Sequence, residues 1–297
     1  MKSGIVAVVG RANAGKSTLV NVIVGEKVAI VSPKPQTTRE RILGVVNGKD
    51  YQIVLEDTPG LYKANSLLSS RMQKCATDAV KDVDVVLFLI DAHDGVKEED
   101  VFNLKKYADG RTPLILVLTK TDIMPKDRIP LAVDAFRDCE NVDKIVSVSA
   151  RRGKNVKKLI EEIVKLLPEG EPIYGEDVVS DRSERYMIAE IMREKVLLKF
   201  DKEIPHGIAI VVNTFEKQKN GVYEVNLDIV CEKPNHKAIL IGKGGQAIKE
   251  VSSFARESME KFLGSKVFLT TYVKVKEGWR DDPSRLKEFG YGKEEFE

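Results

Sequence analysis

Residues 10–17 read Gly-Arg-Ala-Asn-Ala-Gly-Lys-Ser, which fits the phosphate-loop pattern G-x-x-x-x-G-K-[ST]. The pattern follows an apolar run at residues 4–9, typical of a buried strand, and precedes a helical pattern at residues 17–24. Its glycines let backbone N–H groups turn inward around phosphates, and the helix that follows adds the positive end of its dipole. The segment therefore predicts an α/β domain with a phosphate site between a strand and a helix.

The first 167 residues alternate strand-like and helix-like segments. We expect strands at residues 4–9, 52–55, 85–90, 114–118 and 145–148, with an additional edge strand at 42–46. Helices are expected at residues 17–24, 67–81, 96–107, 129–138 and 155–167. Continuous apolar strands separated by helices indicate a mostly parallel sheet covered by helices on both faces.

The pattern changes after Pro168, where residues 168–175 lack periodicity and are typical of a linker. Asp181 and Glu184 predict a capping box for a helix of about 18 residues. The expected order continues with strands at 207–215 and 222–230, helices at 235–241 and 246–263, and a strand at 266–275. Asn220-Gly221 marks the hairpin between the first two of these strands. The order α-β-β-α-α-β predicts a separate α+β domain. We therefore divide the chain into a first domain (1–168), a linker (169–180), a second domain (181–276) and a C-terminal tail (277–297).

The composition excludes several classes of protein. Of 297 residues, 42% are hydrophobic and 32% are charged, which is typical of folded domains and too apolar for a disordered chain. With 48 Lys and Arg against 46 Asp and Glu, the net charge is +2, so any nucleic-acid contact must be a local patch. The three cysteines and three histidines lie too far apart for a zinc site or a disulfide framework. The absence of long apolar runs and of a signal-peptide pattern favours a cytoplasmic protein.

Two further segments fall where a nucleoside triphosphate site needs them. Asp57-Thr58-Pro59-Gly60 follows the strand at 52–55, so Asp57 can hold Mg²⁺ through water and the Gly60 N–H can meet a γ-phosphate. Within the phosphate loop, Lys16 should reach the β- and γ-phosphates, and the Ser17 hydroxyl should bind Mg²⁺.

The base-binding segment is expected after the strand at 114–118, where the chain reads Thr119-Lys120-Thr121-Asp122. Asp122 can accept both the N1 and N2 hydrogens of guanine, a pattern that adenine does not offer. Ser149-Ala150 follows the next strand and could supply a backbone N–H to the guanine O6. The predicted nucleotide-binding residues are Asn13, Ala14, Gly15, Lys16, Ser17, Thr18, Asp57, Thr119, Lys120, Asp122, Ser149 and Ala150.

These four elements, in this order, resemble those of the translation-factor-type GTPases over residues 1 to about 167. Pro35-Gln36-Thr37-Thr38-Arg39 resembles the first switch of the Era family. That resemblance implies that Thr38 closes over the γ-phosphate and Mg²⁺, with Thr37 as the alternative. It gives Lys16, Thr38 and Gly60 as catalytic residues, and Ser17, Thr38 and, through water, Asp57 as metal ligands.

The chain departs from the general GTPase pattern at two positions. Thr119 stands where many GTPases have Asn, and Thr can still hydrogen-bond to the phosphate loop. Leu61 stands where many have Gln, and Leu cannot orient the attacking water, so we expect slow intrinsic hydrolysis. Asn13 resembles the potassium-binding Asn of some related GTPases, so K⁺ could supply the missing charge; alternatively, Asn13 only stabilises the loop.

The second domain carries a G-x-x-G loop between two predicted helices, within Ile241-Gly242-Lys243-Gly244-Gly245. With the order α-β-β-α-α-β, it resembles a type II KH module, which binds unpaired bases. Residues 176–297 hold 21 Lys and Arg against 22 Asp and Glu, yet residues 233–249 hold four lysines and no acid. The predicted RNA-binding residues are Lys233, Lys237, Ile241, Gly242, Lys243, Gly244, Gly245 and Lys249.

A GTPase domain joined to a type II KH domain resembles the Era family over nearly the whole chain. The resemblance implies a monomeric, GTP- and Mg²⁺-dependent switch that binds 16S rRNA near its 3′ end during assembly of the small ribosomal subunit. One alternative is a GTP-regulated module that docks on a protein or on the inner membrane as a peripheral protein. Another, an ATP-dependent RNA enzyme, is disfavoured by Asp122. The aromatic residues of the tail are expected to pack on the second domain rather than to contact RNA.

Overall fold

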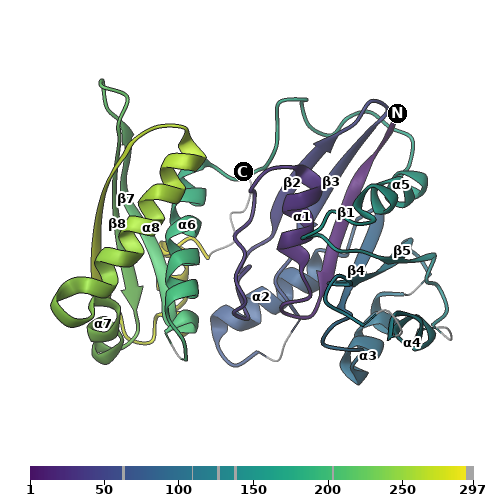
Figure 1. The fold of residues 1–297 in the computed structure, drawn as a ribbon, viewed down its shortest axis with the longest axis horizontal. Helices are drawn as coiled ribbons and strands as arrows, with labels where there is room; N and C mark the ends of the chain where they lie inside the picture. The colour runs from purple at the N-terminus through teal and green to yellow at the C-terminus, as the bar shows by residue number, and fades with distance from the viewer. Residues whose placement is uncertain (62–63, 109, 126–127, 137–138, 203, 292–297) are drawn as a thin grey trace. The chain divides into compact units, whose positions relative to one another are not determined.

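The computed structural model describes residues 1–61, 64–108, 110–125, 128–136, 139–202 and 204–291. The chain forms two compact units, whose elements are labelled in Figure 1. The first unit contains Met1–Ala29, Thr38–Lys63 and Arg71–Asp181, and the second contains Ile30–Thr37, Ala64–Ser70 and Arg182–Glu297. Two short segments of the N-terminal sequence thus fold with the second unit.

A six-stranded sheet with strand order β2-β3-β1-β4-β5-β6 forms the centre of the first unit (Figure 1). Its strands are β1 (Lys2–Gly10), β2 (Ile42–Asn47), β3 (Tyr51–Asp57), β4 (Val85–Asp91), β5 (Leu114–Thr119) and β6 (Lys144–Ser147). The edge strand β2 runs antiparallel to β3, and every other pair is parallel. The predicted mostly parallel sheet, including its additional edge strand, is confirmed.

Helices cover both faces of this sheet because successive strand residues point to opposite sides. The helices are α1 (Lys16–Val24), α2 (Leu67–Asp78), α3 (Glu98–Tyr107), α4 (Arg128–Asp134) and α5 (Val156–Leu166). On one face, Val6 and Val8 of β1 share a core with α1 and α5. On the other face, Val9 of β1 and Phe88 of β4 share a core with α3 and α4.

The functional loops of the first unit follow from this topology. β1 ends at Gly10, β3 at Asp57 and β5 at Thr119. Because these three strands are parallel, their carboxyl ends meet at one edge of the sheet, where α/β folds bind their ligands.

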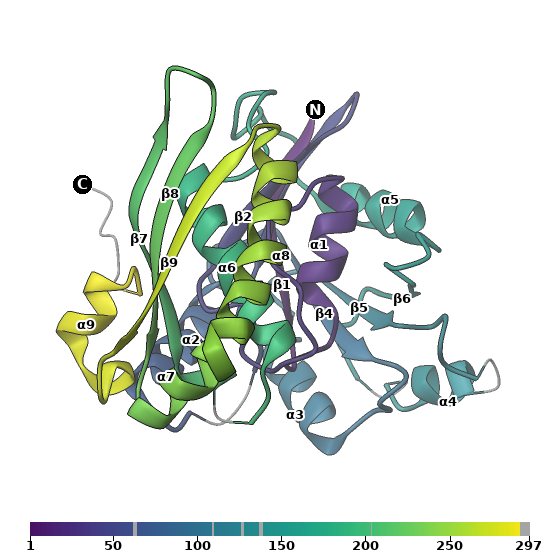
Figure 2. The ribbon, with the colours of Figure 1, turned by 60° about the vertical axis from the view of Figure 1, so that its left-hand side comes forward.

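The second unit packs helices on one face of a three-stranded sheet (Figure 2). Its elements are α6 (Glu184–Lys199), β7 (Ile208–Lys217), β8 (Tyr223–Cys231), α7 (Pro234–Ile241), α8 (Gln246–Leu263) and β9 (Val267–Val275), with α9 (Pro283–Glu288) in the tail. β8 lies between antiparallel β7 and parallel β9. Val225, Leu227 and Ile229 alternate along β8 toward the buried side chains of α6 and α8. The predicted order α-β-β-α-α-β is confirmed.

The N-terminus of α6 differs from the predicted capping box. Ser183 is the N-cap, and its hydroxyl accepts a hydrogen bond from the Tyr186 N–H at 3.2 Å. Asp181 instead accepts a hydrogen bond from the Leu43 N–H at 2.9 Å. The prediction was wrong because a backbone donor of β2, far away in the sequence, binds the Asp181 carboxylate.

The segment Ile30–Thr37 packs on α6. Glu194 accepts a hydrogen bond from the Val31 N–H at 3.1 Å, and Lys34 pairs with Asp201. Arg193 is 1% exposed, pairs with Glu190 and donates to the Thr37 carbonyl oxygen. The segment that leads to Thr38 is therefore fixed by a buried ion pair of the second unit.

The tail packs on the second unit through its aromatic residues. Trp279 is fully buried, and its Nε1 donates to the Gly207 carbonyl oxygen at 3.1 Å. Its ring contacts those of Phe289 and Tyr291. The predicted packing of the tail is thus confirmed for these residues.

Among the described residues, no helix is long and apolar enough to cross a membrane. Cys75, Cys139 and Cys231 are free thiols.

Candidate functional site

The phosphate loop wraps around the side chain of Lys16. Asn13 and Gly15 adopt left-handed conformations, with φ of 64° and 88°, and α1 begins directly after Gly15. The Lys16 ammonium is buried and donates to the carbonyl oxygens of Gly10 and Arg11, both at 3.0 Å. Burial lowers the pKa of Lys16 from 10.5 to about 8, although the charge of Asp57 opposes the shift. An anion placed at the start of α1 would meet this ammonium and the first N–H groups of the helix.

Three oxygen-bearing side chains meet beside the loop. The Ser17 hydroxyl lies 2.6 Å from Asp57 Oδ2 and 2.9 Å from the Thr38 hydroxyl, which itself lies 3.2 Å from Asp57 Oδ2. Burial raises the pKa of Asp57, although the hydrogen bond from Ser17 and the charge of Lys16 oppose the shift. The Thr37 hydroxyl instead donates to the Lys34 carbonyl oxygen at 2.7 Å. Of the two candidate threonines, the structure therefore brings Thr38 to the other predicted metal ligands.

The same cluster fits a hard divalent cation. Asp57 Oδ1 is fully buried, and no hydrogen bond of ordinary geometry reaches it within the described residues. Mg²⁺ prefers oxygen ligands and usually completes its shell with water and substrate phosphates. Within the part of the chain that the structure describes, no three His, Cys, Asp or Glu side chains form a metal cluster.

Gly60 lies against the phosphate loop. A Cβ atom added to Gly60 would come within 2.7 Å of the backbone N and Cα of Ala12. The next residue, Leu61, donates its N–H to the Gly10 carbonyl oxygen at 3.1 Å. Only glycine allows this close approach, which places the Gly60 backbone beside the loop.

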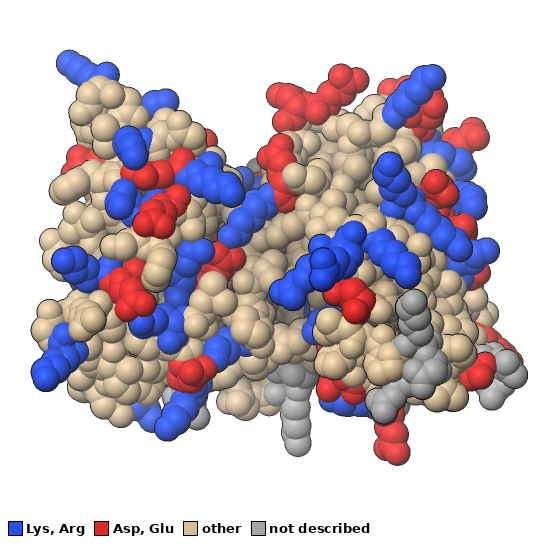
Figure 3. Space-filling model, viewed as in Figure 1, with Lys and Arg blue, Asp and Glu red and all other residues tan. Residues whose placement is uncertain are grey.

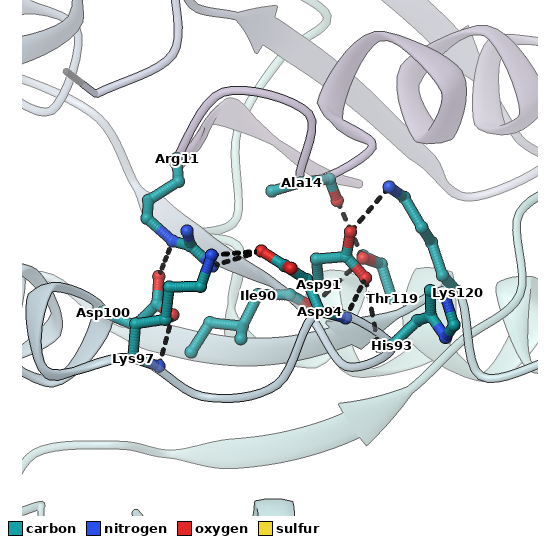
Figure 4. Close-up of polar contacts among 10 residues, drawn as sticks. All are labelled: Arg11, Ala14, Ile90, Asp91, His93, Asp94, Lys97, Asp100, Thr119 and Lys120. Carbon is teal, nitrogen blue, oxygen red and sulfur yellow. Dashed lines mark hydrogen bonds and ion pairs between the residues drawn. The ribbon is translucent and has the colours of Figure 1, made fainter. Parts of the chain in front are cut away.

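The Thr119-Lys120-Thr121-Asp122 segment contacts the phosphate loop through Thr119 (Figure 4). The Thr119 hydroxyl donates to the carbonyl oxygens of Ala14, at 2.8 Å, and Ile90, at 3.0 Å. Lys120 has a φ of 56°, and its ammonium pairs with Asp91 at 2.6 Å (Figure 4). Thr at position 119 therefore makes the hydrogen bond to the loop that was expected of it.

Asp122 and Ser149 come together after β5 and β6. Asp122 is exposed, and a hydrogen bond from the Ser149 side chain lowers the pKa of its carboxyl group. The Ser149 N–H donates to the Lys154 carbonyl oxygen at 3.1 Å. Of the two candidate donors to a guanine O6, the Ala150 N–H is therefore the better one.

The glycine-rich loop of the second unit connects α7 to α8. Gly242, Gly244 and Gly245 all have positive φ values, of 73°, 58° and 78°. At Gly242 a Cβ atom would also lie 2.7 Å from that of Ala247, so this turn needs glycine. The four lysines predicted to bind RNA are exposed, as is Ile239 at 51%, whereas Ile241 is half-buried. On the face drawn in Figure 3, acidic and basic side chains are intermixed, in keeping with the balanced net charge.

Family models match both units. The model of 50S ribosome-binding GTPases matches residues 5–120, and the KH domain model matches residues 203–280. GTPase Era of Clostridium botulinum (strain Okra / Type B1) is 44% identical over 292 residues, covering 98% of this chain and 99% of that protein. The chain belongs to the Era family of GTPases. A GTPase Era of Clostridium perfringens (strain ATCC 13124) has the same identity and coverage.

Two crystal structures of Era family members have the same fold as this chain. An Aquifex aeolicus Era variant bound to GDP and AlF4⁻ matches with a TM-score of 0.94 and 38% identity, over 99% of this chain and 100% of that one. An Era in complex with MgGDPNP and nucleotides 1506–1542 of 16S ribosomal RNA matches with the same TM-score, identity and coverage. The assignment to the Era family and the two-domain fold class are therefore confirmed.

The Era-family pattern did not predict three charged residues beside the nucleotide site. Asp91 pairs with Lys120, and its Oδ1 accepts hydrogen bonds from the N–H groups of His93 and Asp94. Arg11, inside the phosphate loop, pairs with Asp100 of α3. The position of Asp91 at the carboxyl end of a strand could have marked it as a candidate.

Proposed function

We propose that this Era-family chain is a GTP-hydrolysing switch that binds 16S rRNA near its 3′ end and acts in assembly of the small ribosomal subunit. Its GTP-binding half corresponds to residues 1–168, and its RNA-binding half to residues 181–276 after a linker at 169–180. The observation that carries the proposal is the match, over 99% of the chain, to an Era that holds both MgGDPNP and a segment of 16S rRNA.

The phosphate end of GTP would be bound by the loop and by Lys16. We infer that the N–H groups at the start of α1, from Gly15 to Thr18, donate hydrogen bonds to the phosphate oxygens. The ammonium of Lys16 would move from backbone carbonyls to the β- and γ-phosphates. Thr38 and the Gly60 N–H would then meet the γ-phosphate. Charge that develops during in-line attack by water is stabilised by these fixed donors.

Mg²⁺ fits the cluster of Ser17, Thr38 and Asp57. The two hydroxyls would bind the ion directly, and Asp57 would hold it through water. When bound, the ion neutralises phosphate charge. Hydrogen bonds already join Ser17 to Thr38 and to Asp57, so these side chains need little rearrangement to accept the ion.

Hydrolysis by the protein alone is expected to be slow because Leu61 offers no polar atom to orient the attacking water. Asn13 is exposed and has a left-handed backbone in the phosphate loop, where we propose that it helps to hold K⁺ near the phosphates. Faster turnover in K⁺ than in Na⁺ is expected, with Asn13→Ala abolishing the difference. Equal rates of the unmodified protein in the two salts would refute the role of K⁺.

RNA would lie along the loop from Gly242 to Gly245. We propose that its backbone approaches the glycines, while the exposed lysines at 233, 237, 243 and 249 face phosphates and Ile241 lies beneath the bases. Single-stranded RNA suits such a groove because its bases are unpaired and accessible.

Nucleotide state and RNA binding are proposed to be coupled. Thr38 and the Asp57–Gly60 segment contact a γ-phosphate only when GTP is bound, so they can differ between the GTP and GDP states. By thermodynamic reciprocity, any effect of GTP on RNA affinity implies an equal effect of RNA on GTP affinity.

The double variant Lys243→Asp/Gly244→Asp tests the RNA site. It should abolish binding of a single-stranded 16S 3′-end RNA, measured by fluorescence anisotropy, and leave GTP hydrolysis unchanged. A Cβ atom at Gly244 would meet nothing within 4 Å, although the φ of 58° strains any side chain there, so melting temperature is measured alongside. Unchanged RNA affinity would refute the assignment.

The matched control is Lys219→Asp/Gly221→Asp in the hairpin between β7 and β8. It makes the same change in charge within the same unit, at an exposed lysine and at a positive-φ glycine with open space around it. It should leave RNA affinity unchanged. If the loop variant lost binding to anionic lipid vesicles but kept RNA affinity, peripheral membrane docking would replace the RNA proposal.

A further inference from the structure

Arg11 is the second residue of the phosphate loop, and its side chain points away from the loop toward α3 (Figure 4). Its Nε lies 2.6 Å from Oδ1 of Asp100, which is fully buried. The other oxygen of Asp100 accepts a hydrogen bond from the Lys97 N–H at 3.0 Å. Because the Lys97 N–H at the start of α3 binds one oxygen of Asp100, the other oxygen is oriented to bind Arg11.

A second carboxylate contacts Arg11 more weakly. Oδ2 of Asp94 lies 3.5 Å from Nη2 of Arg11. The Asp94 side chain is 52% exposed and also pairs with Lys97 at 2.5 Å. An exposed pair of this kind contributes little, whereas removing one partner of a buried pair leaves an uncompensated charge. Burial acts to lower the pKa of Arg11, but Asp100 and, to a smaller extent, Asp94 outweigh it and the pKa is raised. Asp100 is therefore the main partner of Arg11.

The backbone around Arg11 contacts two of the groups that we propose to face a γ-phosphate, Lys16 and the segment at Gly60. The carbonyl oxygen of Arg11 accepts hydrogen bonds from the Lys16 ammonium at 3.0 Å and from the Ala14 N–H at 3.3 Å. The residue after Gly60, Leu61, forms a parallel bridge with Arg11 and donates to the Gly10 carbonyl oxygen. Displacement of Arg11 would thus move both Lys16 and Gly60.

We propose that Asp100, acting through Arg11, is a positioning residue for recognition of the γ-phosphate. GDP lacks this phosphate and depends on the N–H groups at the start of α1, on the contact of Lys16 with the β-phosphate and on the base-binding residues. GTP depends in addition on the contacts of Lys16 and Gly60 with the γ-phosphate. Loss of the Arg11–Asp100 ion pair therefore weakens GTP binding more than GDP binding.

The test compares Asp100→Asn with Asp94→Asn. The second variant removes a charge that also contacts Arg11, but from the segment just before α3. The affinities of the full chain for GDPNP and for GDP are measured by calorimetry. Asp100→Asn should lower the ratio of GDPNP to GDP affinity by roughly tenfold, in the range expected for small misplacements of binding groups. Asp94→Asn should change this ratio by less than about twofold.

Two further variants separate positioning from folding. Arg11→Lys keeps the charge but loses the planar guanidinium, and should lower the ratio in the same direction by about threefold. Arg11→Met/Asp100→Leu removes both charges, so melting temperature should recover relative to Asp100→Asn while the affinity ratio stays low. Equal losses of GDP and GDPNP affinity in Asp100→Asn and Arg11→Lys, or a normal ratio in the double variant, would overturn the proposal.

Discussion

The two glycine-rich loops of this chain present their lysines in opposite ways. In the phosphate loop, Lys16 is 6% exposed and bound to two backbone carbonyl oxygens. In the loop between α7 and α8, Lys243 and its three neighbouring lysines are exposed. The first loop lies at the carboxyl end of a strand in a mostly parallel sheet, whereas the second connects the helices α7 and α8.

The difference shows how similar residues serve different kinds of phosphate recognition. A buried ammonium interacts strongly with a phosphate because little water screens it, but each atom must be in place beforehand. Exposed ammonium groups interact weakly one by one, adapt to a flexible strand and lose affinity as salt rises. We therefore expect changes in the first loop to have large effects and changes in the second to have small, cumulative ones.

The largest effect should come from Lys16→Met. This change removes the buried charge and its three hydrogen-bond donors, so GTP affinity should fall at least ~100-fold. Titration with a fluorescent GTP analogue measures it. Lys243→Met is the matched variant, and it should leave GTP affinity within about twofold. Comparable losses in the two variants would remove the contrast between the loops.

Glycine substitutions should give the next largest difference. In Gly60→Ala the new methyl group would meet the Ala12 backbone at 2.7 Å, so the loops must separate. Overpacking of this kind costs about 1–3 kcal/mol, and kcat for GTP should fall roughly tenfold to a hundredfold.

Gly244→Ala is the control for Gly60→Ala, because its Cβ would meet nothing within 4 Å. It should leave kcat unchanged and lower RNA affinity only a few-fold through its positive φ. A kcat of Gly60→Ala equal to that of the unmodified protein would contradict the close packing of the two loops.

The titration of Lys16 predicts a smaller effect. In the nucleotide-free protein its pKa is about 8 rather than 10.5, whereas phosphates should raise it again. Binding must then take up a proton above pH 8, so GTP affinity should fall about tenfold between pH 7 and pH 9. Calorimetry in buffers of different ionisation enthalpy measures the uptake.

The lowered pKa of Lys16 also affects stability, which should rise with pH whereas GTP affinity falls. Between pH 8 and 10.5 the unfolded chain binds more protons at this lysine, so this group makes the nucleotide-free protein more stable as pH rises. Lys16→Arg should show neither dependence, because arginine keeps its proton over this range. A pH effect that persists in Lys16→Arg would assign the titration to another group.

Single lysines of the second loop should give the smallest effects. Lys243→Ala should lower RNA affinity about threefold and reduce the slope of log affinity against log salt by about 0.7. With four lysines in contact, the whole slope should be about −3 for a single strand. Lys219→Ala in the hairpin should change neither quantity. A slope much steeper than this would mean that further basic residues contact the RNA.

Local sequence signals were sufficient to predict most of the fold. The strands of the first unit differ from the predicted ones by one or two residues at their ends, and α8 has the predicted bounds. The phosphate loop, Asp57–Gly60 and Thr119–Asp122 were located because each follows an apolar strand, and parallel strands bring their ends together. The expected helix at 129–138 partly lies outside the described residues, and α4 ends at Asp134.

Contacts between distant charged residues could not be predicted in this way. Asp100 stands beside Glu98 and Glu99 in the first turn of α3, where acidic residues are common because they interact with the helix dipole. Its pairing with Arg11, 89 residues away, depends on the tertiary fold. The family resemblance favoured Thr38 over Thr37, and the tertiary fold supplies the physical reason, because Thr38 reaches Ser17 and Asp57 whereas Thr37 binds the Lys34 carbonyl oxygen.

The packing of Ile30–Thr37 on α6 has a practical consequence for anyone who would cut this protein in two. Cleavage between Asp181 and Arg182, just after the proposed linker, would leave Val31 and Thr37 on one fragment and their hydrogen-bond partners on the other. The isolated C-terminal fragment would carry Arg193 and Glu190 with one side newly open to water. Kinetics measured on the isolated N-terminal fragment would therefore describe a Thr38 whose preceding segment has lost its support.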